Sequence, residues 1–111
     1  MLPQKKRLNR KEFDRFFAMG KRIHSPTLTL IFSNEPGLQV SAVAPKKVAK
    51  TAVARNKFRR RVYSIFEKLE HGEQAPHGVF ICIAKAGANT RTFKSLYEEL
   101  STLIHKTRTL R

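Results

Sequence analysis

Two apolar runs typical of β-strands flank a long segment with helical periodicity, and this order constrains the fold more than any other feature. The first run is LQVSAVA (residues 38–44) and the second is VFICIAK (residues 79–85). Between them, five apolar side chains recur at helical spacing: Phe58, Val62, Ile65, Phe66 and Leu69. They span an arc of about 100°, which predicts a helix over residues 52–70 with one face on a sheet. This order forms a βαβ unit, whose strands are normally parallel and whose crossover is right-handed by default.

Further helices are predicted on both sides of this unit. Asn9 and Glu12 have the spacing of a capping box, and Gly20 suits the end of a helix. Residues 10–19 are therefore expected to be helical. Thr92 is a suitable N-cap for a last helix, because apolar side chains follow it at helical spacing. These are Phe93, Leu96, Tyr97, Leu100, Leu103 and Ile104.

Two further strands are predicted before the βαβ unit. Residues 21–26 favour a brief edge strand, and TLTLIFSN (residues 27–34) favours a longer one. Pro36 and Gly37 mark a turn, so the strands on either side of it are expected to form a hairpin. The predicted order is α, two or three strands, α, β, α. This is an α/β fold (an α+β sandwich) with a small mixed sheet, in one domain over residues 1–111.

The charge balance points to a polyanionic partner. The chain has 23 Lys and Arg against 8 Asp and Glu, a net charge of +15 in 111 residues. Self-repulsion of this size destabilises a compact domain unless a partner neutralises it. Nucleic acid is favoured over a membrane, because no apolar run is long enough to span a bilayer and no anchored amphipathic helix is evident. The excess is concentrated in residues 1–26 and 46–68, which are expected to form one patch.

The predicted helix over residues 52–70 is both a core helix and the most basic segment. One flank of its apolar stripe carries polar and aromatic side chains: Asn56, Arg59, Arg60 and Tyr63. Guanidinium groups can bind phosphates, an amide offers both a donor and an acceptor, and a phenol ring can stack on a base. Lys46, Lys47 and Lys50 precede the helix and add to its charge. The alternative is that this charge run is only a solvated face.

Three cations of this helix lie elsewhere on its circumference. Lys57 and Arg61 point to the opposite flank. Arg55 projects almost onto the apolar stripe, but in the first turn. The Arg55 guanidinium can reach solvent only if its side chain extends to one side of the helix, or if the first turn of the helix lies beyond the edge of the sheet. We therefore expect the helix to begin beyond the edge of the sheet.

Phe13, Phe16 and Phe17 also have two interpretations. At helical spacing, aromatic side chains are more often core residues than ligand platforms. Three of them on so short a helix can also leave one at a cleft edge, where a base could stack.

No catalytic constellation is evident. The four histidines lack metal-ligand spacing, and the paired carboxylates of a two-metal nuclease are missing, since Asp14 is the only aspartate. The lone Cys82 lies in an apolar run, which predicts a buried, inert thiol and fits a cytoplasmic protein. We expect no catalytic or metal-binding residue in the chain itself.

The segment KKVAKTAVARNKFRRRVYSIF (residues 46–66) resembles the signature of the protein component of bacterial ribonuclease P. In that family a Lys-Lys pair ends a strand and an Arg-Asn-basic segment opens the next helix. RLNRKEFDRFFAMGKRIHSP (residues 7–26) resembles the first helix of the family and the turn beyond it. VFICIAKAGA (residues 79–88), followed by a helix with leucine spacing, resembles the C-terminal half, so the resemblance covers nearly the whole chain.

The resemblance implies a fold and a role. The βαβ crossover would be left-handed, opposite to the default. The basic helix would contact the catalytic RNA subunit, and a cleft between it and the sheet would receive the 5′ leader of precursor tRNA. The RNA subunit, with bound Mg²⁺, would cleave the leader from the tRNA, and the protein would raise substrate affinity. The predicted partners are therefore this RNA and precursor tRNA, with no membrane and no protein partner.

The predicted site follows from these matches. The RNA-binding residues are Lys46, Lys47, Lys50, Arg55, Asn56, Lys57, Arg59, Arg60 and Arg61, and the leader-cleft residues are Phe13, Phe17 and Tyr63. The chain departs from the family pattern at Ser41, Pro45, Ala49, Tyr63 and Ala86. A ribosomal or other structural RNA-binding protein is the alternative, because it would have the same bulk charge. An independent nuclease is a third possibility, disfavoured by the missing carboxylates.

Overall fold

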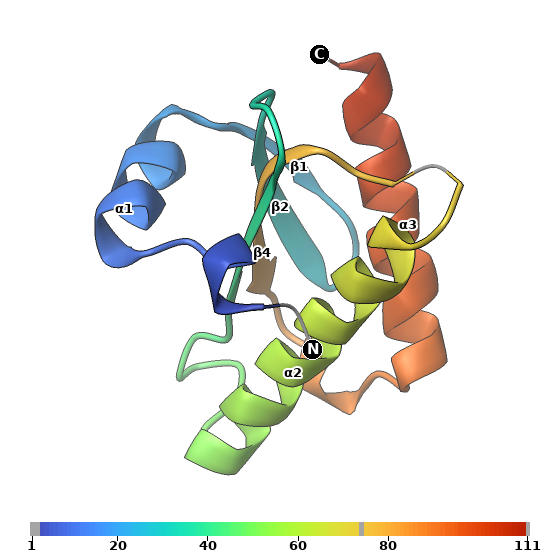
Figure 1. Ribbon diagram of the computed structural model, residues 1–111. Helices are drawn as coiled ribbons and strands as arrows, with labels where there is room; N and C mark the ends of the chain where they lie inside the picture. Colours follow the sequence, from blue (N-terminus) through green and yellow to red (C-terminus); the bar gives the residue numbers. More distant parts are fainter. Residues whose placement is uncertain (1–2, 74, 111) are drawn as a thin grey trace.

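The computed structural model describes residues 3–73 and 75–110, and contains one mixed sheet and three main helices (Figure 1). The elements in chain order are η1 (Gln4–Lys6), α1 (Arg10–Met19), β1 (Lys21–His24), β2 (Leu28–Ser33), β3 (Leu38–Val43), α2 (Ala52–Glu70), β4 (Gly78–Ala84), η2 (Ala88–Thr90) and α3 (Phe93–Thr109). The sequence therefore predicted the main helices and all of the strands. It did not predict η1 or η2.

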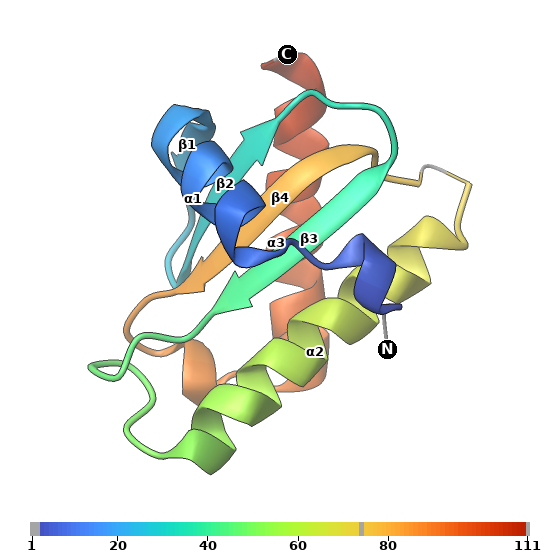
Figure 2. The same cartoon turned by 60° about the vertical axis from the view of Figure 1, so that its left-hand side comes forward.

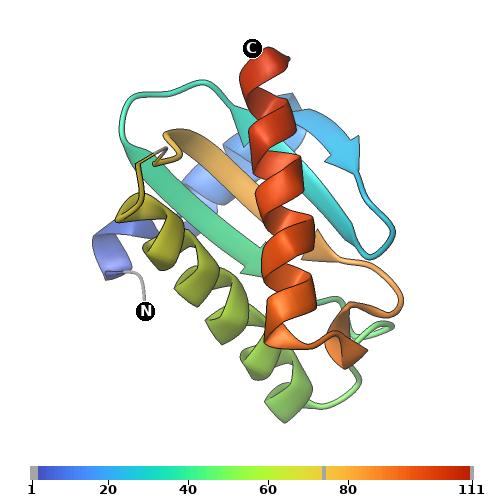
Figure 3. The ribbon, with the colours of Figure 1, turned by 90° about the vertical axis from the view of Figure 1, so that its right-hand side faces the viewer.

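The strand order in the sheet is β1-β2-β4-β3. β4 pairs antiparallel with β2 and parallel with β3, so the sheet is mixed and β3, α2 and β4 form the predicted βαβ unit. Figure 3 views the sheet from the side of α2 and α3. When β3 and β4 are turned to point upward in that view, β4 lies to the left of β3. The crossover is therefore left-handed, as the family resemblance implied and against the general rule.

The predicted hairpin between β2 and β3 is wrong, because β4 lies between these strands and pairs with both. β4 is buried along nearly its whole length, with only Ile83 half-buried. A strand that is apolar on both faces is most stable in the centre of a sheet, where helices cover both sides. The turn at Pro36 and Gly37 therefore connects two strands, β2 and β3, that are separated in the sheet by β4. The Gly78 N–H at the start of β4 donates to the Gly37 carbonyl in this turn (2.6 Å).

Alternate residues of the strands pack on opposite sides of the sheet and form two core clusters. α2 and α3 cover one face, where Phe66 of α2 packs on Phe80 of β4 with ring centroids 5.4 Å apart (Figure 3). α1 crosses the other face, where Phe16 packs with Ile31 and Ile81 (Figure 2). No helix within residues 3–73 and 75–110 has the length and apolarity needed to cross a bilayer.

Local signals place the ends of α1. Asn9 and Glu12 form the predicted capping box, with the Glu12 N–H donating to Asn9 Oδ1 at 2.8 Å. Gly20 ends the helix, but with an extended backbone rather than the left-handed one of a glycine stop. A Cβ at this position would lie 2.6 Å from Ile31 Cγ2, so glycine allows the close approach of α1 to β2.

A carboxylate of α3 holds the turn between β1 and β2. Glu99 accepts hydrogen bonds from the Thr27 N–H (2.8 Å), the Thr27 hydroxyl (2.7 Å) and the Ser25 hydroxyl. The guanidinium of Arg91 lies 3.5 Å away. Burial acts to raise the pKa of Glu99, but the hydrogen bonds from Ser25 and Thr27, together with Arg91, outweigh it and hold the pKa below its ordinary value. The ionised carboxylate therefore stabilises the fold.

We expect Glu99→Gln to lower the free energy of unfolding by about 1–3 kcal/mol at neutral pH, because an amide accepts these hydrogen bonds less well. Since folding lowers the pKa, the carboxylate contributes its full stability above the unfolded pKa and loses it as the pH falls through the folded pKa. Chemical unfolding at neutral and acidic pH measures both effects. Glu98→Gln removes the same charge from an exposed position of α3 and serves as the control. A difference from the unsubstituted protein that stays constant with pH would contradict this assignment.

Candidate nucleic-acid interface

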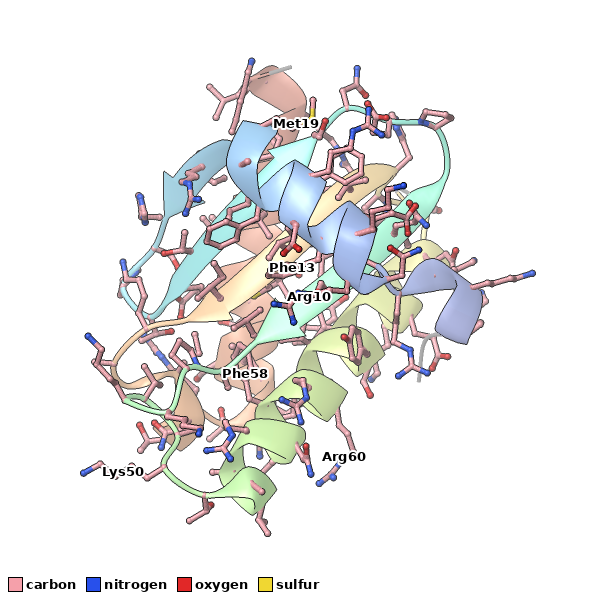
Figure 4. All side chains as sticks on the ribbon, turned by 90° about the vertical axis from the view of Figure 1, so that its left-hand side faces the viewer. Arg10, Phe13, Met19, Lys50, Phe58 and Arg60 are labelled. Atoms are coloured by element: carbon pink, nitrogen blue, oxygen red, sulfur yellow. The ribbon has the colours of Figure 1, made fainter. Side chains whose placement is uncertain are left out.

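The loop before α2 displays three lysines on a fixed backbone. The N–H groups of Val48 and Ala49 donate to the Pro45 carbonyl (2.9 and 3.0 Å), which forms a turn. Ala49 is buried and Val48 packs against the larger core cluster. Lys46, Lys47 and Lys50 remain exposed, and Figure 4 shows Lys50 extending away from the loop. Buried small residues thus anchor the loop, while its cations face outward.

The start of α2 extends beyond the sheet, as predicted from Arg55 (Figure 2). Thr51 caps the helix by accepting from the Ala54 N–H (3.1 Å). Arg55 is half-buried, and its Nη1 donates to the Ala49 carbonyl (3.0 Å). Arg55 therefore fastens the lysine loop to the first turn of α2, and only part of its guanidinium is left for a ligand.

Asn56, Arg59 and Arg60 lie together on one flank of α2, as predicted. Asn56 and Arg60 are exposed, whereas Arg59 is half-buried and donates to Asn56 Oδ1. Figure 4 shows Arg60 pointing away from the helix. Among the described residues, neither arginine forms an ion pair with a carboxylate. This flank, which we call the Asn56 flank, therefore presents charges that the rest of the described chain does not neutralise.

Lys57 and Arg61 lie on the opposite flank and face η2. Arg61 Nη1 donates to the Arg91 carbonyl at 2.6 Å, which ties α2 to the start of α3. Both side chains line a pocket of about 240 Å³ together with Asn89 and the exposed Val53. The predicted RNA-binding residues are thus divided between two flanks of one helix end and the loop before it.

Tyr63 does not belong to the exposed surface on which the sequence placed it. Only 9% of its surface is exposed, and it packs in the core cluster beneath α2. The guanidinium of Arg7 covers its ring, with Cζ 5.5 Å from the ring centroid. The structure therefore does not bring Tyr63 together with Phe13 and Phe17, which lie on α1 at the other face of the sheet.

The three phenylalanines of α1 differ in burial, and the structure confirms the core interpretation for Phe16. Phe16 is a core residue with 4% exposure, whereas Phe13 is half-buried and Phe17 is 38% exposed. The rings of Phe13 and Phe17 stack with centroids 5.6 Å apart and an interplanar angle of 26°. Figure 4 shows Phe13 between α1 and the sheet. Arg22, which the sequence analysis did not single out, lies 4.6 Å from the Phe17 centroid. This pair offers an aromatic edge with a cation beside it.

Metal-binding side chains are not clustered in the part of the chain that the structure describes. Within residues 3–73 and 75–110, no three His, Cys, Asp or Glu side chains come close enough to hold a metal ion. Cys82 is fully buried, and burial raises the pKa of its thiol, so it is the inert thiol that the sequence predicted. A displayed basic helix end is typical of a nucleic-acid-binding protein.

Comparisons with known proteins identify the family. The family model described as Ribonuclease P matches residues 2–108. The ribonuclease P protein component of Pseudanabaena is 33% identical over 99% of this chain and 97% of its own length. That of Vibrio vulnificus is 31% identical over 89% of this chain and 84% of its own. The chain belongs to the ribonuclease P protein family.

Solved structures show the same fold. A mutant RNase P protein of Staphylococcus aureus superposes with a TM-score of 0.82 at 18% identity, over 95% of this chain and 90% of that one. The RNase P protein of Thermotoga maritima gives 0.76 at 23% identity, over 90% and 96%. The chain is thus the protein component of a ribonucleoprotein endonuclease that matures tRNA 5′ ends, and its partner is the ribonuclease P RNA. The alternative of a ribosomal protein is not supported.

Proposed function

We propose that the loop of Lys46, Lys47 and Lys50 and the start of α2 bind the catalytic RNA, and that α1 and the sheet face beneath it bind the 5′ leader of precursor tRNA. One observation carries this proposal: five exposed polar or charged side chains, none of them ion-paired with a described carboxylate, are displayed at one end of the molecule. They are Lys46, Lys47, Lys50, Asn56 and Arg60. Lysines bind phosphates as point charges, whereas the arginine fork gives two directed hydrogen bonds.

The two surfaces would have different tasks. The loop and α2 bind folded RNA through its phosphates, which fixes the protein on the RNA subunit. Phe17 and Phe13 provide stacking surfaces for unpaired leader bases, and Arg22 adds a charge for the leader backbone. The protein therefore holds a substrate strand beside an RNA to which it is itself bound. This arrangement raises substrate affinity without any chemical step on the protein.

The hydrolysis belongs to the RNA subunit. Mg²⁺ held by that RNA supplies charge neutralisation and activation of water. The residues of this chain reduce the repulsion between two RNA strands, so less Mg²⁺ is needed for the same affinity. The complex would act in the cytoplasm, where precursor tRNA is made and where the free Cys82 thiol stays reduced.

Reconstitution tests the proposal. We expect the protein, added to its cognate catalytic RNA, to lower the Mg²⁺ concentration needed for 5′ cleavage and to increase the affinity for precursor tRNA roughly tenfold. The physical reason is that one protein binds both strands, the catalytic RNA at the start of α2 and the leader beside Phe17 and Arg22, and its charge reduces their mutual repulsion. Cleavage of substrate over a Mg²⁺ titration, with and without the protein, measures both changes.

Two controls make this experiment specific. A substrate whose leader is shortened to a single nucleotide should lose the gain in affinity but keep the assembly of the protein with the RNA. Phe17→Ala should reduce the gain only for the long leader, because Phe17 is exposed and contributes little to the core. If the protein changes neither the Mg²⁺ requirement nor the substrate affinity, the proposed function is wrong.

A further inference from the structure

Residues 3–9 precede α1 and are called the N-terminal segment here; they lie between β3 and α2 (Figures 2 and 3). Arg7 forms a parallel bridge with Val40 of β3, and the Leu8 N–H donates to the Val40 carbonyl at 3.0 Å. Lys6 pairs with Glu70 near the end of α2. Residues 6–8 are therefore held to both elements.

A polar pocket opens where this segment meets α1, β3 and α2. Its volume is about 460 Å³, and six polar or aromatic side chains line it: Lys5, Arg7, Asn9, Glu12, Gln39 and Tyr63. It is separate from the aromatic edge of Phe13 and Phe17. None of its lining residues other than Tyr63 was among the predicted site residues.

Arg7 is the unusual member of this pocket. Its guanidinium lies over the buried Tyr63 ring, and its Nε is buried without a hydrogen-bond partner. No described carboxylate lies within ion-pair distance of it. By contrast, Arg55 and Arg61 each donate to a backbone carbonyl. A half-buried cation without an acceptor is costly, which indicates that an anion from outside the chain completes this site.

The position of the pocket favours an RNA phosphate as that anion. Tyr63 follows Arg59 and Arg60 by one helical turn on the same side of α2, so the pocket continues the Asn56 flank. At about 1.5 Å per residue, Asn56 and Tyr63 are about 10 Å apart along the helix, a distance that a few nucleotides span. The exposed Lys5 adds a second charge at the rim.

We propose that this pocket binds one phosphodiester group of the RNA, with Arg7 as its principal ligand. The inference rests on the proposed function, because it extends the RNA contact of α2 onto residues 5–9. Arg7 is a binding residue in this scheme, and the Tyr63 ring beneath it keeps the fork oriented. The N-terminal segment is thus a second RNA-contacting element.

Salt-dependent binding tests the pocket. We expect Arg7→Gln to weaken RNA binding roughly 5- to 8-fold at about 0.1 M salt and to reduce the slope of log K against log salt by roughly 0.7–0.9. Gln39→Glu places a carboxylate in the same pocket without removing Arg7 from Tyr63. It should weaken RNA binding while leaving the thermal unfolding temperature unchanged or higher, because the new carboxylate can pair with Arg7.

The matched control is Arg15→Gln, since Arg15 also covers an aromatic ring, Phe16, at 4.9 Å but lies exposed on α1. Binding is measured in two arms, the catalytic RNA alone and precursor tRNA with the assembled complex. A reduced slope for Arg7→Gln in either arm supports the pocket and identifies the strand. Equal slopes for the unsubstituted protein, Arg7→Gln and Gln39→Glu in both arms overturn the proposal. An equal loss for Arg15→Gln in the catalytic-RNA arm, where α1 is not the binding element, overturns it as well. If Arg7→Gln does not fold, Gln39→Glu decides. Failure of the unsubstituted protein to bind the RNA would instead contradict the proposed function.

Discussion

Replacing Arg59 and Arg60 together with alanine is expected to lower the affinity for the catalytic RNA roughly 25- to 60-fold at about 0.1 M salt. Each guanidinium that contacts a phosphate releases counterions, and each contact contributes roughly 0.7–0.9 to the salt slope. The double variant should therefore lose about 1.4–1.8 units of slope. Binding titrations at several salt concentrations give both quantities. The fold should persist, because Arg60 is exposed and, among the described residues, the Arg59 side chain bonds only to the Asn56 side chain.

The control for this variant carries the same change in net charge at another place. Lys94 and Lys106 are exposed on α3, away from the start of α2. Their joint replacement with alanine should change the salt slope by much less. If both double variants lose the same affinity, the RNA responds to total charge, and the Asn56 flank is not a defined interface.

The second large effect concerns the packing that positions the flank. Phe66→Ala should lower the free energy of unfolding by about 3–5 kcal/mol, because Phe66 is fully buried against Phe80 and its loss leaves a cavity. That is a large share of the total stability of a small domain. Chemical unfolding monitored by circular dichroism measures the change.

The same side chain in an exposed position provides the comparison. Phe17→Ala should lower the free energy of unfolding by no more than about 1 kcal/mol, since 38% of the Phe17 surface is exposed to solvent. The catalytic RNA binds only the folded protein, so it should restore much of the stability lost in Phe66→Ala. A similar cost for both alanine variants would show that α2 is not fixed to the sheet by Phe66.

The sequence predicted those features that depend on local signals. Asn9 and Thr92 cap their helices as predicted, and the apolar spacing set the extents of α1 and α2 correctly, whereas the Thr51 cap of α2 was not predicted. The display of Asn56, Arg59 and Arg60 followed from the same periodicity. Helix ends and helix faces are determined within a few residues of chain, which is why a single sequence suffices for them.

Contacts between distant segments could not be predicted in the same way. The hairpin failed because the partner of β2 is β4, more than forty positions later in the chain. Tyr63 lies at the margin of the apolar stripe, so its spacing did not show whether it would be exposed. In the structure the Arg7 guanidinium, from a distant segment, lies over its ring. The segment before α1 has no periodicity, so nothing local indicated that it would join β3. The left-handed crossover came from the family resemblance and not from physical rules.

The central place of β4 makes sheet formation a late event during synthesis of the chain. Until residues 78–84 have left the ribosome, β2 and β3 have no strand between them, and α2 lacks the Phe80 ring on which Phe66 packs. The pairings on both sides of β4 join distant parts of the sequence, and such long-range contacts form slowly. An incomplete chain therefore displays its cations without holding them in a fixed geometry. Selective recognition of the RNA begins only when the C-terminal half is in place.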